Sequence, residues 1–206
     1  YDVLKTMSLE NVRYAEIRFA PLLSETSTMN CRAVIEALLK GLERGRADFG
    51  TRFGVITCAM RHHSQEDNSR MIKTAREYLG CGVCAADLAG AESAYPMSQF
   101  MELFQNTRRL DMPFTIHAGE CGSVQNVIDS VSAGAGRIGH GIALKGHYRI
   151  QRELAERGTG IEMCPISNLQ TKAVNSTAEY PIREFLNAGL KVSINTDNRT
   201  VSNTSL

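Results

Sequence analysis

The stretch Phe114-Thr-Ile-His117-Ala-Gly119-Glu120 is a β-rich run that ends in a histidine, with a glycine turn and a carboxylate directly after it. The turn at Gly119 lets His117 and Glu120 face one pocket without following the alternation of a strand. Neutral imidazole is a good zinc ligand, and a carboxyl group beside a metal can act as a general acid or base. An isolated H-x-x-E is more often a strand end whose histidine bonds to the backbone, so the meaning of this stretch depends on the rest of the chain.

Seven short β-rich or apolar runs follow one another along the chain, and stretches with helical spacing separate them. The runs lie at residues 12–20, 52–60, 82–88, 113–118, 137–140, 160–164 and 191–195. Residues 30–49 place Val34, Ile35, Leu38, Leu39 and Leu42 on one stripe, as an amphipathic helix does. Other helices are predicted after the capping-box pair Ser64 and Asp67, around Pro96, after the cap Ser123, and at residues 148–157 and 181–188.

This alternation predicts an α/β fold with parallel strands and right-handed crossovers. An open doubly wound sheet gathers its chemistry at one switch point, whereas a closed barrel places chemistry at the ends of many strands. Polar residues able to do chemistry follow nearly every predicted strand: Arg61 with His62 and His63, Asp87, His117 with Glu120, His140, Ser167, and Asp197 with Asn198. We therefore expect a (β/α)8 TIM-type barrel, incomplete because a full barrel has about 250 residues and eight strands. No linker divides the chain, so residues 1–206 are expected to form one partial barrel domain.

The composition excludes several classes of protein. The chain has 206 residues, 43% of them hydrophobic, and its 23 Lys and Arg nearly balance its 22 Asp and Glu, for a net charge of +1. Nucleic acid is therefore not an expected partner. No apolar run approaches the about 20 residues of a membrane span, and no secretory leader is recognised. A membrane is therefore not an expected partner either. The six cysteines are expected to be reduced thiols of a cytoplasmic protein.

Two further strand ends carry candidate site residues. Gly139-His140-Gly141 flanks an imidazole with glycines that allow close approach, and the strand ending near Asn195 delivers Asp197 and Asn198. Each alone is more often structural. Together with His117 and Glu120, however, they bring ligands or acid–base groups from three strands to one rim of a barrel.

Two other motifs are set aside. The glycine pattern at residues 134–139 matches G-x-G-x-x-G, but it lies between a helix and a following strand, whereas dinucleotide sites need a strand, then a loop, then a helix. Cys81-Gly-Val-Cys84 has no second pair at zinc-finger spacing and lies in a strand-like segment. Small buried thiols are expected there.

Several motifs in order give the chain a close resemblance to the adenosine deaminases of the metal-dependent amidohydrolase superfamily. The motifs lie at residues 14–21, 58–62, 87–92, 117–120, 139–141, 164–165 and 195–197. The resemblance implies a (β/α)8 barrel that holds one zinc ion. It also implies hydrolytic deamination of adenosine and 2'-deoxyadenosine to inosine and deoxyinosine with release of ammonia, as part of purine salvage.

The resemblance also assigns roles to residues. His117 and Asp197 correspond to zinc ligands, Glu120 to the acid that protonates purine N1, and His140 to the group that orients and deprotonates the attacking water. The backbone of Gly90 corresponds to the contact to purine N3. Asp87 is expected to support the site at the same rim.

This sequence departs from the family in two ways. The residue after the zinc-binding aspartate is typically a second Asp that bonds purine N7, and here it is Asn198. Because an amide NH2 donates without carrying an added proton, we expect Asn198 to keep the contact. The family's His-x-His pair of the first barrel strand is also missing from the sequence, and neither the adjacent His62 and His63 nor His147 is a good substitute. We expect from this a fragment lacking the first barrel strand and the C-terminal end, with little or no activity as an isolated chain.

The sequence is also compatible with alternative functions. The nearest alternative is an adenine or related purine deaminase of the same superfamily. We place it second because residues 87–92 resemble the nucleoside-specific form of the family. A catalytically silent purine-binding protein fits the missing histidines, but the joint presence of His117, Glu120, His140 and Asp197 argues against it. A flavin or nicotinamide enzyme rests only on the misplaced glycine pattern. The expected partner is a small purine nucleoside, and the sequence leaves the oligomeric state and the choice of sugar open.

Overall fold

A computed structural model describes residues 1–205 of the chain. The chain folds into two compact units, residues 1–88 with 106–113, and residues 89–105 with those from 114 onward. The single-domain expectation for residues 1–206 stays a prediction.

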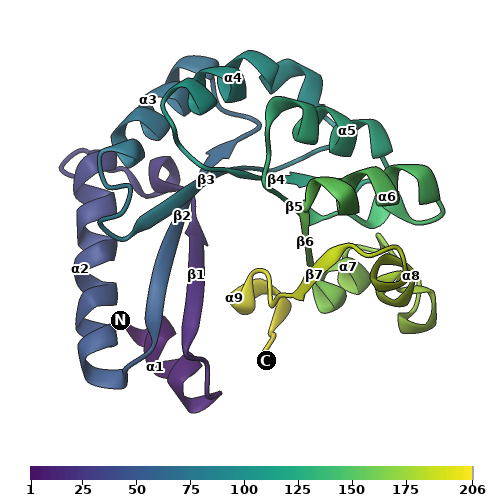
Figure 1. The fold of residues 1–206 in the computed structure, drawn as a ribbon. Helices are drawn as coiled ribbons and strands as arrows, with labels where there is room; N and C mark the ends of the chain where they lie inside the picture. Colours follow the sequence, from purple (N-terminus) through teal and green to yellow (C-terminus); the bar gives the residue numbers. More distant parts are fainter. Residues whose placement is uncertain (206) are drawn as a thin grey trace. The chain divides into compact units, whose positions relative to one another are not determined.

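The first unit is built on a sheet with the strand order β1-β2-β3. The strands are β1 (Tyr14–Phe19), β2 (Arg52–Met60) and β3 (Val83–Ala89). β1 and β2 pair in parallel, with Tyr14 opposite Arg52 and Phe19 opposite Thr57. The long helix α2 (Cys31–Phe49) runs beside β2 (Figure 1) and buries Val34, Ile35 and Leu42 of the predicted stripe.

Helix α1 (Asp2–Leu9) packs on α2 and was not predicted from the sequence. Its Leu4 is fully buried, and a Cβ at Gly45 of α2 would lie 3.1 Å from the Cβ of Leu4. The absent side chain at Gly45 therefore lets the two helices approach closely.

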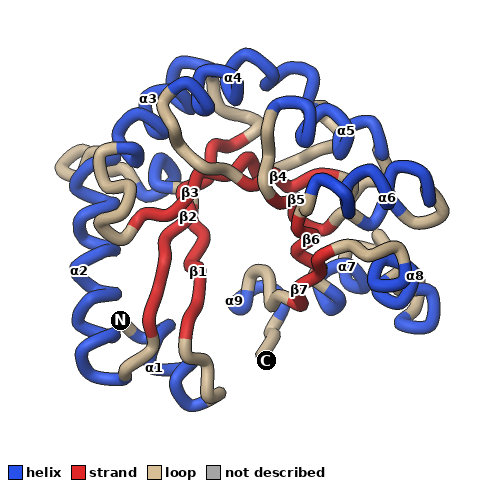
Figure 2. Tube along the Cα trace, in the orientation of Figure 1, coloured by secondary structure: helices blue, strands red, loops and turns tan. Residues whose placement is uncertain are grey.

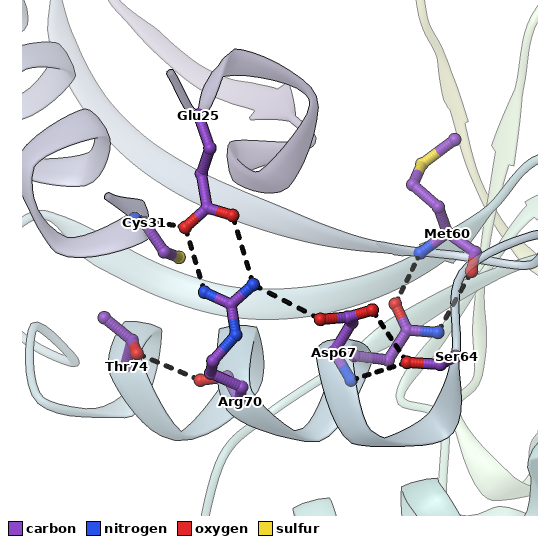
Figure 3. A network of polar contacts seen from close by, with 8 residues as sticks. Glu25, Cys31, Met60, Ser64, Asp67, Arg70 and Thr74 are labelled. Carbon is purple, nitrogen blue, oxygen red and sulfur yellow. Dashed lines mark hydrogen bonds and ion pairs between the residues drawn. The ribbon is translucent and has the colours of Figure 1, made fainter. Parts of the chain in front are cut away.

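An ion-pair network ties helix α3 (Gln65–Arg76) to the start of α2 (Figure 3). The Arg70 guanidinium donates to both carboxylate oxygens of Glu25, at 2.9 and 3.1 Å, and to Asp67 at 3.3 Å. Glu25 also accepts the backbone N–H of Cys31 at 2.6 Å. The predicted cap is confirmed, because Ser64 Oγ accepts the Asp67 N–H at 3.0 Å and begins α3. Hydrogen bonds from Arg70 lower the pKa of Glu25.

The second unit is built on a parallel sheet with the order β4-β5-β6-β7. The strands are β4 (Thr115–Ala118), β5 (Arg137–His140), β6 (Gly160–Met163) and β7 (Lys191–Ile194). Helices α5, α6 and α8 lie on one side of this sheet in Figure 2, and α7 and α9 are short helices that contact each other. Their bounds are α5 (Val124–Ala133), α6 (Tyr148–Arg157), α7 (Pro165–Gln170), α8 (Ile182–Asn187) and α9 (Arg199–Ser202). Because the strands are parallel, their carboxyl ends meet at one edge of the sheet.

The seven predicted strands are all present, and each end differs from its prediction by no more than two residues. Helix α6 has its predicted bounds, and Ser123 caps α5 by accepting the N–H of Asn126. The segment around Pro96 begins as a 3-10 turn, Met97–Phe100, and continues as α4 (Met101–Arg109). The predicted α/β class with parallel strands is therefore confirmed. Every helix of residues 1–205 is too short or too polar to span a bilayer.

Candidate active site

His117 and Glu120 lie at the carboxyl end of β4 and in the loop that follows it. Between them Gly119 has φ 74°, a left-handed conformation that favours glycine, and it makes the turn expected from the sequence. His117 lies opposite Gly139 of β5. A Cβ at Gly139 would lie 3.3 Å from His117 Cα and 3.4 Å from its ring carbon Cγ, so the glycine allows this imidazole to pack closely. The sequence pattern predicted that the flanking glycines allow close approach to His140. In the structure, the side chain that packs closely against Gly139 is that of His117.

His140 ends β5 and is buried, with 2% of its surface exposed. Its φ is 66°, an uncommon value for a residue with a Cβ. Residues with such backbone angles cluster at functional sites. Its Nε2 lies 3.6 Å from Oε2 of Glu120, and its ring centre lies 5.2 Å from that of His117. The structure therefore brings together the three residues of β4, its loop and β5 that the sequence singled out.

Asn168 of α7 holds the other side of the His140 ring and was missed in the sequence. Its side-chain amide is hydrogen-bonded to His140 Nδ1 at 2.9 Å, and its Oδ1 accepts the hydroxyl of Tyr180 at 3.1 Å. Asn168 is fully buried, and burial also raises the pKa of Tyr180. Because Nδ1 is engaged by the amide, Nε2 is the ring nitrogen left to face Glu120. The search for polar residues after strand ends singled out Ser167, which directly precedes Asn168, the hydrogen-bond partner of His140.

Asp197 follows β7 and is exposed, with φ 55°. Its carboxylate, a ring nitrogen of His140 and the thiol sulfur of Cys164 all lie within 4.8 Å of one another. Nitrogen, sulfur and carboxylate oxygen are the donor types that zinc binds, so the side chains gathered here fit this metal. Within residues 1–205 this set of three does not include His117, whose ring instead packs against His140.

Asn198, the next residue, caps α9. Its Oδ1 accepts the N–H of Val201 at 3.0 Å. The amide oxygen is thus engaged within the chain, and the NH2 group is the part of the side chain left to donate.

A cavity of about 460 Å³ opens beside Glu120. It is lined by Glu120, Cys121 and Gly122 of the loop after β4 and by Thr171, Lys172 and Ala173 after α7. Thr171 Oγ1 donates to Oε1 of Glu120 at 3.2 Å. Small-molecule sites in proteins are cavities of about this size, roughly 300–1,000 Å³.

The remaining predicted site residues lie in and just after β3. Asp87 belongs to the first unit and is fully buried, with Arg18 Nε at 3.4 Å and the thiol of Cys58 at 3.5 Å from its Oδ2. Gly90 belongs to the second unit and has φ 107°, which a residue with a Cβ rarely adopts.

The G-x-G-x-x-G motif lies in the second unit and the C-x-x-C motif in the first. Gly134 ends α5 and Gly139 lies in β5, so the glycine pattern does connect a helix to a strand. The expectation of buried thiols in the C-x-x-C is wrong for Cys81, which is exposed because it lies in the turn before β3, and Cys84 is half-buried. His62 and His63 lie in a turn of the first unit with ring centres 4.4 Å apart, and burial lowers the pKa of His63.

The model of the adenosine deaminase family matches residues 1–206, the whole chain. The chain belongs to the adenosine deaminase family. An adenosine deaminase of Enterococcus faecalis is 43% identical over 206 residues, which are 100% of this chain and 61% of that protein. The chain thus spans about three fifths of the length of the curated relatives it matches. The resemblance seen in the sequence is confirmed.

Solved structures of the superfamily share the fold. The adenine deaminase of Arthrobacter aurescens matches 96% of this chain and 60% of its own, with 25% identity and a TM-score of 0.84. An amidohydrolase of Burkholderia ambifaria, solved with bound zinc, matches 100% of this chain and 58% of its own, with 23% identity and a TM-score of 0.90. Such amidohydrolases are TIM barrels, and the seven strands of this chain are those of an incomplete barrel.

Proposed function

We propose that this chain carries the chemical core of a zinc-dependent adenosine deaminase, which converts adenosine and 2'-deoxyadenosine to inosine and deoxyinosine with release of ammonia. The observation that supports it most is the meeting of Glu120, His140 and Asp197 at the carboxyl ends of β4, β5 and β7. These are acid, base and metal-ligand groups, in a chain whose whole length matches the adenosine deaminase family. A role in purine salvage in the cytoplasm belongs to the same proposal.

One zinc ion would be held by His117 and Asp197 in this proposal. The contacts that support it are the Asp197 carboxylate within 4.8 Å of a donor atom of His140 and the His117 ring packed against the same imidazole. The thiol sulfur of Cys164 lies with the Asp197 carboxylate and the His140 ring nitrogen in the same set of donor atoms. A bound zinc ion lowers the pKa of water toward about 7, which supplies a nucleophile at neutral pH.

His140 is proposed to orient the attacking water and take its proton. The ring is fixed through Nδ1 by Asn168, so Nε2 is the nitrogen that can face the water. Glu120 is proposed to donate a proton to purine N1, which draws electron density from C6 as the water attacks there. The 3.6 Å separation of the two side chains keeps the acid and the base on one small region of substrate.

The purine itself is proposed to contact Gly90 and Asn198. Backbone at Gly90 would meet N3, and the Asn198 NH2 group would donate to N7, which is an acceptor. The engagement of Asn198 Oδ1 by the cap of α9 favours that orientation of the amide. A supporting role for Asp87, which contacts Arg18 and Cys58, belongs to the same proposal.

Adenine deamination is the second candidate, because one of the solved structures that this chain resembles is an adenine deaminase. The two proposals differ in whether the substrate must carry a sugar.

The test is a deaminase assay on the protein as its cells make it. We expect ammonia release from adenosine to exceed that from adenine by at least about 100-fold in kcat/KM, one zinc ion per chain by mass spectrometry, and loss of activity on dialysis against a chelator. Faster turnover of adenine would replace the nucleoside with the free base. Absence of turnover of either, with zinc bound, would leave a silent purine-binding protein.

A further inference from the structure

Glu92 is a buried carboxylate, 4% exposed, whose side chain reaches the loop that carries Glu120. Its Oε1 accepts the N–H of Gly119 at 2.6 Å, and its Oε2 accepts the N–H groups of Glu120 at 3.0 Å and Cys121 at 3.1 Å. One carboxylate thus binds three consecutive backbone amides across 27 to 29 residues of sequence.

The three amides can converge only because the loop is bent. Gly119 is in the left-handed region, and successive N–H groups of such a turn form a concave site for an anion. A Cβ at Gly119 would lie 2.7 Å from Cγ2 of Val127 in α5, so the loop also packs closely against this helix. The shape of the loop is therefore set by its hydrogen bonds to Glu92 and by its packing against α5.

Glu92 is itself held in place. Asn126 of α5 donates its amide to Glu92 Oε1 at 2.9 Å, and its own Oδ1 accepts the N–H of Met97 at 2.9 Å. Asn126 is also buried, at 4% exposure. Burying a carboxylate is costly unless hydrogen bonds satisfy it, and four donors do so here.

We infer that Glu92 is a positioning residue, whose carboxylate fixes the backbone of the Gly119–Cys121 turn and thereby aims the Glu120 side chain at His140. Glu120 contributes its own N–H to Glu92, so the direction in which its side chain leaves the backbone depends on that bond. From this backbone the carboxyl reaches to within 3.6 Å of His140 Nε2. The catalytic consequence of this inference rests on the proposed function, whereas the effect of Glu92 on the backbone of the loop is independent of it.

The first arm of the test is hydrogen exchange, which needs no activity. In Glu92→Gln one acceptor oxygen is replaced by an NH2 group that faces N–H donors, so we expect the amides of Gly119, Glu120 and Cys121 to exchange at least about tenfold faster than in the unaltered protein. The matched control is Glu156→Gln, an exposed glutamate of α6, which should leave these three amides unchanged. Equal protection of the three amides in Glu92→Gln would overturn the inference.

The second arm is turnover. A displacement of a catalytic group by about 1 Å can cost about 100-fold in rate, so we expect kcat of Glu92→Gln on adenosine to fall by about that factor while KM and zinc content stay within about threefold. Glu92→Asp keeps both acceptor oxygens on a side chain one methylene shorter, and it should recover part of the lost kcat. A variant whose kcat per zinc-loaded chain is unchanged, or an aspartate no better than the glutamine, would reduce Glu92 to a structural residue.

The two proposals fail in different ways. If adenosine deamination is wrong, the unaltered protein does not turn over adenosine, while the exchange arm still reports on the loop. If only the role of Glu92 is wrong, the unaltered protein is active and the variants behave like Glu156→Gln. Should Glu92→Gln not fold, Glu92→Asp and its exchange rates decide the question.

Discussion

Two glutamates, Glu25 in the first unit and Glu92 in the second, both accept backbone N–H groups, but in opposite surroundings. The side chain of Glu25 is 25% exposed and forms an ion pair with the guanidinium of Arg70, whose side chain is 46% exposed (Figure 3). Glu92 is 4% exposed and is surrounded by amide donors. An exposed ion pair is screened by water and contributes little, whereas a buried carboxylate that binds backbone amides fixes the shape of the chain. The first unit therefore uses its glutamate to join two helices, and the second unit uses its own to shape a loop.

The largest expected effect comes from the residue that this loop presents. Glu120→Gln keeps the size of the side chain but cannot donate a carboxylic proton, so we expect kcat on adenosine to fall by about 1,000-fold, within the range of general acid catalysis. Steady-state kinetics of the zinc-loaded protein measure it, with Glu156→Gln as the control. A loss below about tenfold would mean that Glu120 is not the acid. The loop that Glu92 binds would then present no catalytic group.

The partner of His140 should matter next. Asn168→Ala removes the hydrogen bond to Nδ1, so the ring can rotate and we expect kcat to fall by about 10- to 100-fold. The ¹⁵N shifts of the His140 ring nitrogens should change as well, which loss of packing elsewhere would not cause. Asn175→Ala, at an exposed position, is the matched control and should affect neither value. Unchanged ring shifts in Asn168→Ala would separate this amide from the chemistry.

Much of the fold follows from local sequence. Strands and the longer helices show in the period of apolar residues, and the caps Asn30, Ser64 and Ser123 are the residue types that bind free N–H groups at a helix start. Helices α1, α7 and α9 were missed; they have eight, six and four residues, so each offers at most about two turns in which to read a period. Length alone does not decide this, because α8, also six residues long, lies within the predicted helix at residues 181–188. The alternation of strands and helices along the chain was enough to predict that the strands are parallel.

The candidate site divides in the same way. His117, Glu120, His140 and Asp197 carry their chemistry in their own side chains and stand at strand ends, so the sequence could single them out. Glu92 and Asn168 act only through a partner 27 to 29 residues away, and an ordinary Glu or Asn in the sequence carries no sign of that partner. Only the folded chain shows which backbone amides or which imidazole nitrogen they meet.

A smaller effect is expected where the site meets substrate at an exposed position. Asn198→Ala removes one proposed hydrogen bond to purine N7, worth about 1 kcal/mol, so KM for adenosine should rise about fivefold with kcat nearly unchanged. Asn198 also caps α9, and Asn198→Ser keeps a cap while removing the NH2 group. Both variants should raise KM. If only the alanine does, the effect belongs to the cap and not to the purine.

The smallest effect is expected in the first unit, and its pH dependence tests the comparison directly. Arg70→Ala removes the cation from Glu25 and from Asp67, and because these ion pairs are solvent-accessible we expect the free energy of unfolding at pH 7 to fall by only about 0.5–1 kcal/mol. Arg70 lowers the pKa of Glu25 in the folded chain, so the stabilisation is fully present above the ordinary glutamate pKa of about 4.3. It is lost as the pH falls through the lowered pKa, where Glu25 takes a proton in the folded state too. Urea unfolding followed by circular dichroism should therefore show the two proteins differing at pH 7 and converging in acid. A difference that persists in acid, or one well above 1 kcal/mol at pH 7, would show that Arg70 acts through packing of its stem on α3, and that exposure does not separate Glu25 from Glu92 in the way we argue.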